Sequence, residues 1–421
     1  MERSAALELD KNDPLHKYKE QFLIADPDTC YLDGNSLGRL PHKTITAINE
    51  FLTQEWGREV VTGWAHWVDE AQSTGDLIAR SALGSGAGQV LACDTTSVNF
   101  YQLASAAIAA RPGRKTIITD AANFPTDRYI LQGIAKNLGL NLVTIDNEDP
   151  TIAVHELITP EILQRYMSDD VALVSLEVVQ YRSGARQDIG AINEVVKKHG
   201  ALMLWDAAHA IGSVQMDFDL REVDLAVGCT YKYGNSGPGA PAWLYVSRRI
   251  QRELNVPIQG WFAQRDQFAM GPDFERDDSI RGFQIASPSL MGLRSIKSAF
   301  EMIEEAGISA IEKKAAAGTA MMIALFDQWL APLGFSLNTP RDAKSRGGHI
   351  SLVHPDAEQI ALALRKVANV IPDYRVPNSI RVAMSPLATS YVEVYDGFQR
   401  LRDLVASKKY LGVSDADSRV T

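Results

Sequence analysis

The chain has 421 residues, of which 46% are hydrophobic and 22% charged, and its 42 Lys and Arg against 52 Asp and Glu give a formal net charge of −10. A chain of this length can bury a core without disulfide or metal staples, and an acidic balance disfavours nucleic-acid binding, which depends on clustered Lys and Arg. These numbers predict a globular protein of two or three domains with no nucleic-acid partner.

The three cysteines, Cys30, Cys93 and Cys229, lie far apart and match no metal-ligand spacing. They predict a reducing, cytoplasmic location and no metal site. Residues 1–10 mix acidic with apolar side chains and lack the basic start and apolar run of a signal peptide. Because no apolar stretch reaches the roughly 18 to 20 uninterrupted residues of a membrane span, no membrane segment is expected.

Short β-branched runs alternate with helical patterns between residues 115 and 247. The strands predicted there are, in chain order, Thr116–Thr119, Leu142–Ile145, Val171–Val178, Leu202–Trp205, Leu225–Val227 and Ala242–Val246. Between two of them, Ile189–Lys198 carries apolar residues three and four positions apart, which predicts a covering helix. This alternation is typical of a mostly parallel central sheet with helices on both faces.

The pattern changes near residue 289, where a long helical region over 291–329 begins. The strand, helix and strand predicted after it, His349–Val353, Ala357–Val370 and Ser379–Val382, fit a small α+β domain. The sequence therefore predicts three parts. These are an N-terminal segment over 1–45 that packs with the small domain, a large α/β domain over 46–288, and a small C-terminal α+β domain over 289–421.

Two neighbouring predicted strands deliver reactive side chains. One leads into Asp206, with His209 three residues later, and the next leads to Tyr231 and Lys232. Because ligands of open parallel sheets sit at the carboxyl ends of strands, these side chains should open onto one crevice. Taken singly, Asp206 also fits a helix N-cap, Lys232 a solvated strand end, and His209 an ordinary core residue.

An acid and an amine together favour pyridoxal phosphate chemistry. A lysine amine holds that cofactor's aldehyde, and a facing carboxylate keeps its pyridine nitrogen protonated so that the ring can accept electrons. Few other chemistries need an acid at the end of one strand and an amine at the end of the next.

Eight motifs in a fixed order resemble those of one enzyme family. They are Tyr31–Gly38 (YLDGNSLG), Asp94–Asn99 (DTTSVN), Asn123–Asp127 (NFPTD), Gln180–Gly184 (QYRSG), Asp206–Gly212 (DAAHAIG), Thr230–Asn235 (TYKYGN), Gly260–Phe262 (GWF) and Ser379–Tyr391 (SIRVAMSPLATSY). In these motifs the chain resembles kynureninase, a pyridoxal-phosphate enzyme of fold type I within the class V aminotransferase superfamily. The resemblance implies that fold and cofactor. It also implies hydrolysis of the Cβ–Cγ bond of kynurenine or 3-hydroxykynurenine to alanine and anthranilate or 3-hydroxyanthranilate, a step of tryptophan catabolism.

The same resemblance assigns the cofactor ring to five residues. Lys232 is the Schiff-base lysine, Asp206 pairs with the pyridine nitrogen, and His209 supports Asp206 or the cofactor. Phe124 stacks on the ring with Asp127 close to it, although NFPTD also reads as a turn before a helix.

The phosphate is assigned to Thr96 and Ser97, in a hydroxyl-rich turn that enters a helix. Plain N-capping is the competing interpretation of these two residues. Tyr231 would also reach the phosphate and transfer protons, with its pKa moved towards neutrality. Trp261 and Ser287 would come from the partner subunit, which implies a homodimer with shared active sites.

Arg381 matches the family's arginine for the substrate α-carboxylate, which a guanidinium grips through two parallel hydrogen bonds. A surface salt bridge is the alternative. Trp64 and Ala286 fall where the family lines the pocket for the aromatic ring, and Trp64 equally fits core packing. The chain departs from the family at 263–264, which read Ala-Gln where many relatives carry Gly-His, and at Ala388, which replaces a tyrosine. These departures leave open the choice between kynurenine, 3-hydroxykynurenine and a related γ-keto amino acid.

Two other functions compete with kynurenine cleavage. One is another class V activity, such as an aminotransferase or a cysteine desulfurase. A desulfurase needs a nucleophilic cysteine in a mobile loop. The other is a fold-type-I protein kept as a non-catalytic binding module. Retention of Lys232, Asp206, Tyr231 and Arg381 argues against a pure binder.

Overall fold

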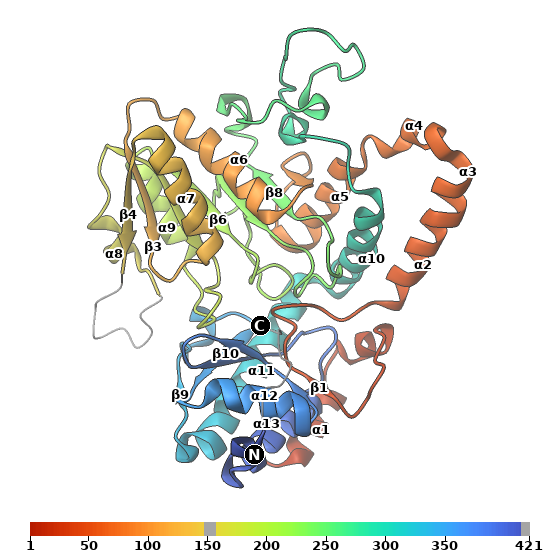
Figure 1. Ribbon diagram of the computed structural model, residues 1–421, viewed down its shortest axis with the longest axis vertical. Helices are drawn as coiled ribbons and strands as arrows, with labels where there is room; N and C mark the ends of the chain where they lie inside the picture. Colours follow the sequence, from red (N-terminus) through yellow and green to blue (C-terminus); the bar gives the residue numbers. More distant parts are fainter. Residues whose placement is uncertain (147–156, 414–421) are drawn as a thin grey trace.

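The structure, a computed structural model, describes residues 1–146 and 157–413, which fold into a larger and a smaller part (Figure 1). The elements of the larger part are α2 (His42–Glu50), α3 (Gly57–Glu59), α4 (Trp64–Trp67), α5 (Glu70–Ile78), β2 (Val90–Ala92), α6 (Thr96–Ala109), β3 (Thr116–Asp120), α7 (Pro125–Leu138), β4 (Asn141–Ile145), α8 (Pro160–Gln164), β5 (Val171–Glu177), α9 (Ile189–Lys198), β6 (Leu202–Asp206), β7 (Leu225–Gly228), β8 (Trp243–Val246) and α10 (Leu290–Ala306). The elements of the smaller part are α1 (Arg3–Lys11), β1 (Cys30–Tyr31), α11 (Ile308–Leu325), β9 (Ser336–Leu337), β10 (His349–Val353), α12 (Ala357–Val367), β11 (Val370–Ile371), β12 (Asp373–Arg375), β13 (Ser379–Ala383) and α13 (Tyr391–Ala406).

The larger part is built on a seven-stranded sheet in the order β2-β8-β7-β6-β5-β3-β4. The strands from β7 to β4 pair in parallel, so the predicted mostly parallel sheet is confirmed. Strand β8 runs antiparallel to β7, because the loop over 229–242 contains no crossover helix and a parallel return needs one. Strand β2 was not predicted, since its three residues are too few to show a period.

Helices cover both faces of this sheet. The chain moves outward from β3 through α7 to β4, but in the opposite direction from β5 through α9 to β6. Because crossovers between parallel strands are right-handed, α7 and α9 lie on opposite faces. Helix α9 has the predicted bounds, and its Ile189, Ile192 and Val196 side chains are buried against the sheet.

The smaller part holds an antiparallel sheet, β12-β13-β10-β9, and a parallel pair of β1 with β11. The predicted helical region over 291–329 is two main helices, because Gly307 takes φ +79° between α10 and α11. The helix predicted to end at Val370 ends instead at Val367, since Asn369 takes φ +51° and the next two residues join β1.

The two hydrophobic cores show how the parts share the chain. Helix α10 and the start of α11 contribute to the larger core. The C-terminal end of α11, from Met321 onward, contributes to the smaller core. The N-terminal segment contributes to both cores, with Tyr18 and Phe22 in the larger and Cys30 and Leu32 in the smaller. The domain boundaries drawn from the sequence stay predictions. We group α10 with the larger part because its buried apolar side chains belong to the larger core.

No helix within 1–146 and 157–413 is both long and apolar enough to cross a membrane. Over the same ranges, the side chains of His, Cys, Asp and Glu form no group of three or more arranged to hold a metal ion.

Candidate active site

A cavity of about 320 Å³ lies where the carboxyl ends of β6 and β7 meet the N-termini of α6 and α7. It is lined by Asp94, Thr95, Thr96, Ser97, Phe124, Thr126, Asp127, Asp206, Ala208, His209, Cys229, Tyr231, Lys232, Gly239, Ala240 and Ala242. The structure therefore brings together eight of the residues singled out in the sequence, Thr96, Ser97, Phe124, Asp127, Asp206, His209, Tyr231 and Lys232.

A larger cavity of about 690 Å³ lies between the two parts, beside α11 and the residues at 343–345. Four of its charged side chains form two ion pairs, Arg186 with Glu312 and, at 3.8 Å, Arg221 with Asp188. Charges that are already paired offer little for chemistry, so the smaller cavity is the candidate active site.

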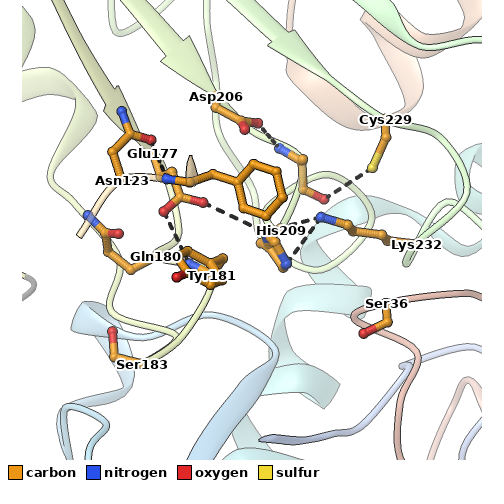
Figure 2. Close-up of polar contacts among 12 residues, drawn as sticks. Ser36, Asn123, Glu177, Gln180, Tyr181, Ser183, Asp206, His209, Cys229 and Lys232 are labelled. Carbon is orange, nitrogen blue, oxygen red and sulfur yellow. Dashed lines mark hydrogen bonds and ion pairs between the residues drawn. The ribbon is translucent and has the colours of Figure 1, made fainter. Parts of the chain in front are cut away.

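Lys232 reaches its position through the loop after β7, and Asp206 is the last residue of β6. The Lys232 Nζ atom lies 3.1 Å from Nε2 and 3.3 Å from Nδ1 of His209, as Figure 2 shows. One carboxylate oxygen of Asp206 accepts a 2.7 Å hydrogen bond from the backbone N–H of Ala208. Burial raises the pKa of Asp206, whereas Lys232 and this N–H oppose that rise. A fixed anion thus faces the cavity.

Asp127 lies in the first turn of α7, beside Asp206. Burial and the Asp206 carboxylate raise the pKa of Asp127 well above its usual range. The Oδ2 atom of Asp127 is buried and has no hydrogen-bond partner within the described chain. A buried acceptor in that state is satisfied by a bound group, which fits a cationic pyridine ring in this cavity.

The N-terminus of α6 forms one wall of the cavity. Thr95 caps this helix, and its hydroxyl accepts a hydrogen bond from Val98 N at 3.4 Å. Thr96 and Ser97 follow in the first turn, where unpaired backbone N–H groups and the helix dipole favour an anion. This wall fits a phosphate group. Thr95 was missed in the sequence, although its place in the DTTSVN motif gives the signal of an N-cap.

Phe124 precedes α7 and faces the lysine. Its backbone N–H donates to Asn123 Oδ1 at 2.7 Å, and Pro125 begins the helix, so the turn is held on both sides. The Lys232 Nζ atom lies 6.0 Å from the centre of the Phe124 ring, which meets the Tyr181 ring edge to face at 5.3 Å. A flat ring above the lysine suits stacking on a second flat ring.

The protein's own groups around Tyr231 do not lower the pKa of its phenol. The Cys229 thiol beside it and its burial raise the pKa of this phenol, rather than moving it towards neutrality. A phosphate placed next to it would raise that pKa further, since a like charge disfavours ionisation. Tyr231 therefore keeps its proton at neutral pH and can donate it.

Arg381 is not among the residues that line the cavity, and its ion pair is buried, so the alternative of a surface salt bridge is wrong. Its side chain on β13 is fully buried and pairs with Asp373, which is also fully buried. Its Nη1 atom lies 3.3 Å from His209 Nε2, and its Nη2 donates to Ser36 Oγ at 3.0 Å. The guanidinium therefore sits behind His209 and joins the smaller part to the site.

Besides Arg381, four of the predicted residues lie outside this cavity in one chain. Trp64 packs against Trp67, at 5.6 Å between ring centres, and against Phe262, at 6.3 Å. Trp261 is 43% exposed, and Ala286 and Ser287 are also exposed. None of these four side chains is among the residues that line the cavity of the same chain.

The two departures from the family pattern have structural roles. Gln264 closes its own loop, because its side chain accepts from Glu275 N at 2.6 Å and donates to Asp273 O at 3.2 Å. Ala388 is fully buried and belongs to the larger core.

Gly38 brings the N-terminal segment against the lysine loop. Its N–H donates to Tyr231 O at 2.7 Å, and a Cβ at this position would lie 2.4 Å from Lys232 O. We expect Gly38→Ala to destabilise the protein by about 1 to 3 kcal/mol and to weaken cofactor binding, because the backbone at residue 232 must shift. Cofactor titration by absorbance measures the second effect. Gly133→Ala is the matched control, since its Cβ meets nothing within 4 Å. Equal binding by both variants would contradict this account.

A lysine, a facing acid and a helix N-terminus at one edge of a mostly parallel sheet define a pyridoxal-phosphate enzyme of fold type I. Solved structures share the fold. The apo cysteine desulfurase from Thermococcus onnurineus NA1 aligns with a TM-score of 0.77 and 17% identity, over 95% of this chain and 98% of that one. A variant of C-DES with glycine covalently linked to its PLP cofactor aligns with a TM-score of 0.76 and 16% identity, over 90% and 97%.

Closer relatives identify the family. A kynureninase from Burkholderia pseudomallei (strain 1106a) is 34% identical over 414 residues, which cover 97% of this chain and 96% of the relative. A kynureninase from Pseudomonas fluorescens is 33% identical over 416 residues, with the same coverage. The family model for the kynureninase C-terminal domain matches residues 311–401. The chain therefore belongs to the kynureninase family, and pyridoxal phosphate is its cofactor.

Proposed function

We propose that this chain hydrolyses the Cβ–Cγ bond of L-kynurenine or 3-hydroxykynurenine, giving alanine and anthranilate or 3-hydroxyanthranilate in tryptophan catabolism. The observation that carries the proposal is the convergence of Lys232, Asp206 and the N-terminus of α6 on one cavity, in a chain of the kynureninase family.

The roles of the cavity residues follow from their surroundings. Bound pyridoxal phosphate supplies an electron sink. We assign to Lys232 the attachment of the cofactor and, when its amine is free, the transfer of the proton at the substrate α carbon. Asp206 holds the ring nitrogen protonated, because Lys232 and the Ala208 N–H keep its charge in a buried place. Thr96 and Ser97 hold the phosphate.

Two further residues are assigned to the substrate. Tyr231 keeps its phenolic proton and donates it at the carbonyl or the β carbon, which suits its raised pKa. Arg381 binds the α-carboxylate through Nη2, where a carboxylate oxygen can replace the Ser36 hydroxyl that now accepts its hydrogen bond. Asp373 keeps the guanidinium in place.

The cysteines argue against the desulfurase alternative. Cys30, Cys93 and Cys229 are all free and buried. Burial raises the pKa of each thiol, so none is a ready thiolate nucleophile. Three free thiols also suit the reducing cytoplasm in which we place the protein.

We propose that the protein is a homodimer that shares its active sites. Trp261, Phe268, Met270 and Met291 are 43%, 65%, 70% and 44% exposed, and Trp261 contacts Phe268 at 6.5 Å between ring centres. Exposed apolar side chains such as these are common at interfaces. In this arrangement Trp261 and Ser287 complete the partner's phosphate site, and Trp64 and Ala286 line the pocket for the substrate ring.

Mixing two inactive variants tests the shared site. We expect Lys232→Ala and Trp261→Ala each to be inactive alone, because each removes a part of both sites in its own dimer. After subunit exchange, about half of the dimers are mixed and each has one intact site, so activity should return to about a quarter of the wild-type value. Native mass spectrometry of the mixture, which separates the mixed dimer from the two parent dimers by mass, controls for exchange. No recovery in a mixture that does exchange would place Trp261 in its own chain's site.

Turnover tests the function itself. The purified protein should be yellow, lose its colour with borohydride, and release fluorescent anthranilate and alanine from kynurenine. Parallel assays with 3-hydroxykynurenine measure which ring it prefers. A coloured protein that releases alanine and sulfur from cysteine, or transfers the amino group to a keto acid, would favour another class V activity.

A further inference from the structure

Glu177 is a buried acid behind the active site that none of the eight motifs includes. It ends β5 and pairs in parallel register with Asp206, the last residue of β6. Its side chain is 1% exposed and points to the same edge of the sheet as Asp206 and His209, as Figure 2 shows. A carboxylate is kept in such a place only where donors satisfy it.

One oxygen of Glu177 is satisfied and the other is not. Oε2 accepts a hydrogen bond from the backbone N–H of Tyr181 at 3.2 Å. Oε1 is buried, has no hydrogen-bond partner within the described residues, and lies 3.8 Å from Nδ1 of His209. Since an unpaired buried acceptor is costly, Oε1 needs a donor, and a small rotation of the imidazole brings Nδ1–H to it.

The surroundings of the other ring nitrogen indicate where the proton of His209 lies. Nε2 is 3.1 Å from Lys232 Nζ and 3.3 Å from Arg381 Nη1. A guanidinium only donates, so Nε2 must accept. Lys232 also lies 3.3 Å from Nδ1, but cofactor attachment takes up its amine, whereas Arg381 still faces Nε2. The proton of a neutral ring is therefore left on Nδ1, towards Glu177.

We propose that Glu177 is a positioning residue, which accepts the Nδ1 proton of His209 and so fixes the plane and tautomer of the ring between Lys232 and Arg381. This inference rests on the proposed function, since it concerns how the same site is held. Glu177 touches neither cofactor nor substrate and acts through His209.

The charges around the pair support this arrangement. Burial and the carboxylates of Asp206, Asp120 and Asp127 raise the pKa of Glu177, which makes it a strong acceptor for a proton. Burial, Lys232, Arg381, His349 and Arg375 lower the pKa of His209, so the ring stays neutral and carries one N–H.

The test compares two substitutions in the holoenzyme. Glu177→Gln keeps an acceptor oxygen, and Glu177→Met keeps the length but removes it. We expect Glu177→Met to lower kcat by about 10²-fold with little change in KM, as a misplaced catalytic group does, and to shift the pH midpoint of the cofactor absorbance. Glu177→Gln should restore most of both. Asp120→Asn, which removes another acid of this cluster, is the matched control and should leave the midpoint near the wild-type value. Two results would overturn the proposal. One is an equal effect of Glu177→Met and Glu177→Gln, and the other is a shift of the midpoint by Asp120→Asn as large as that by Glu177→Met.

A second measurement needs no variant at position 177. In wild-type protein with ring-¹⁵N histidine, the resonances lost in His209→Gln should show a protonated Nδ1 and an unprotonated Nε2. The reverse tautomer, or an imidazolium at neutral pH, would overturn the proposal. Because this readout requires no turnover, it is separate from a failure of kynurenine cleavage.

Discussion

Replacing Lys232 with alanine is expected to lower kcat/KM for kynurenine by at least about 10²- to 10⁴-fold, the usual contribution of a positioned general base. The loss follows from its place, since Nζ lies within 3.3 Å of both nitrogens of His209 and lines the cavity with Asp206. The variant should still bind the cofactor, because Asp206, Phe124 and the N-terminus of α6 remain. It should do so without a covalent link.

Mass spectrometry after borohydride reduction measures that link. Wild-type protein should carry reduced cofactor on the peptide that contains Lys232, and Lys232→Ala should carry none. Lys115→Ala is the matched control, because this exposed lysine precedes β3 at the opposite edge of the sheet and its loss should change neither adduct nor rate. An active Lys232→Ala protein with the adduct on another lysine would contradict the assignment.

The positions of Asp206 and Lys232 could be predicted because their signals are local. Each follows a short buried strand, and neighbouring parallel strands open their carboxyl ends onto the same edge. The mostly parallel sheet could be predicted from the alternation of strands and helices, whereas fold type I followed from the resemblance of the eight motifs. The bounds of α9 could also be predicted, since the 3.6-residue period and the lysines before Gly200 mark its face and its end.

Contacts set by strand register carry no local signal. Glu177 meets Asp206 only because β5 and β6 pair in that register. Asp373 meets Arg381 because β12 and β13 pair with these two residues opposite each other. The resulting buried ion pair was not predicted for Arg381. The direction of β8 likewise depends on a connection without a helix, and neither feature is visible in hydrophobic periodicity.

Removal of Arg381 is expected to damage stability as well as substrate binding. Its side chain and that of Asp373 are both fully buried, so Arg381→Met removes the buried partner of a buried carboxylate, at a cost of up to about 3 to 5 kcal/mol in the free energy of unfolding. Arg381→Lys retains the charge and should retain most of that stability. It should still raise KM strongly, because a single ammonium lacks the planar fork with which the guanidinium holds Asp373 and the substrate carboxylate at the same time. Urea unfolding and steady-state kinetics on the two variants separate these roles.

Arg375 provides the matched control, because it donates to the same Asp373 oxygen at 2.9 Å but its side chain is 29% exposed. A partly exposed ion pair contributes about 0 to 1 kcal/mol, so Arg375→Met should change unfolding little and leave KM near its wild-type value. If Arg381→Lys binds substrate as well as wild type while Arg381→Met only unfolds more easily, Arg381 is a structural partner of Asp373, and the α-carboxylate must find its cation elsewhere in the site. A high KM in a stable Arg381→Lys protein instead requires that the guanidinium contact the substrate itself.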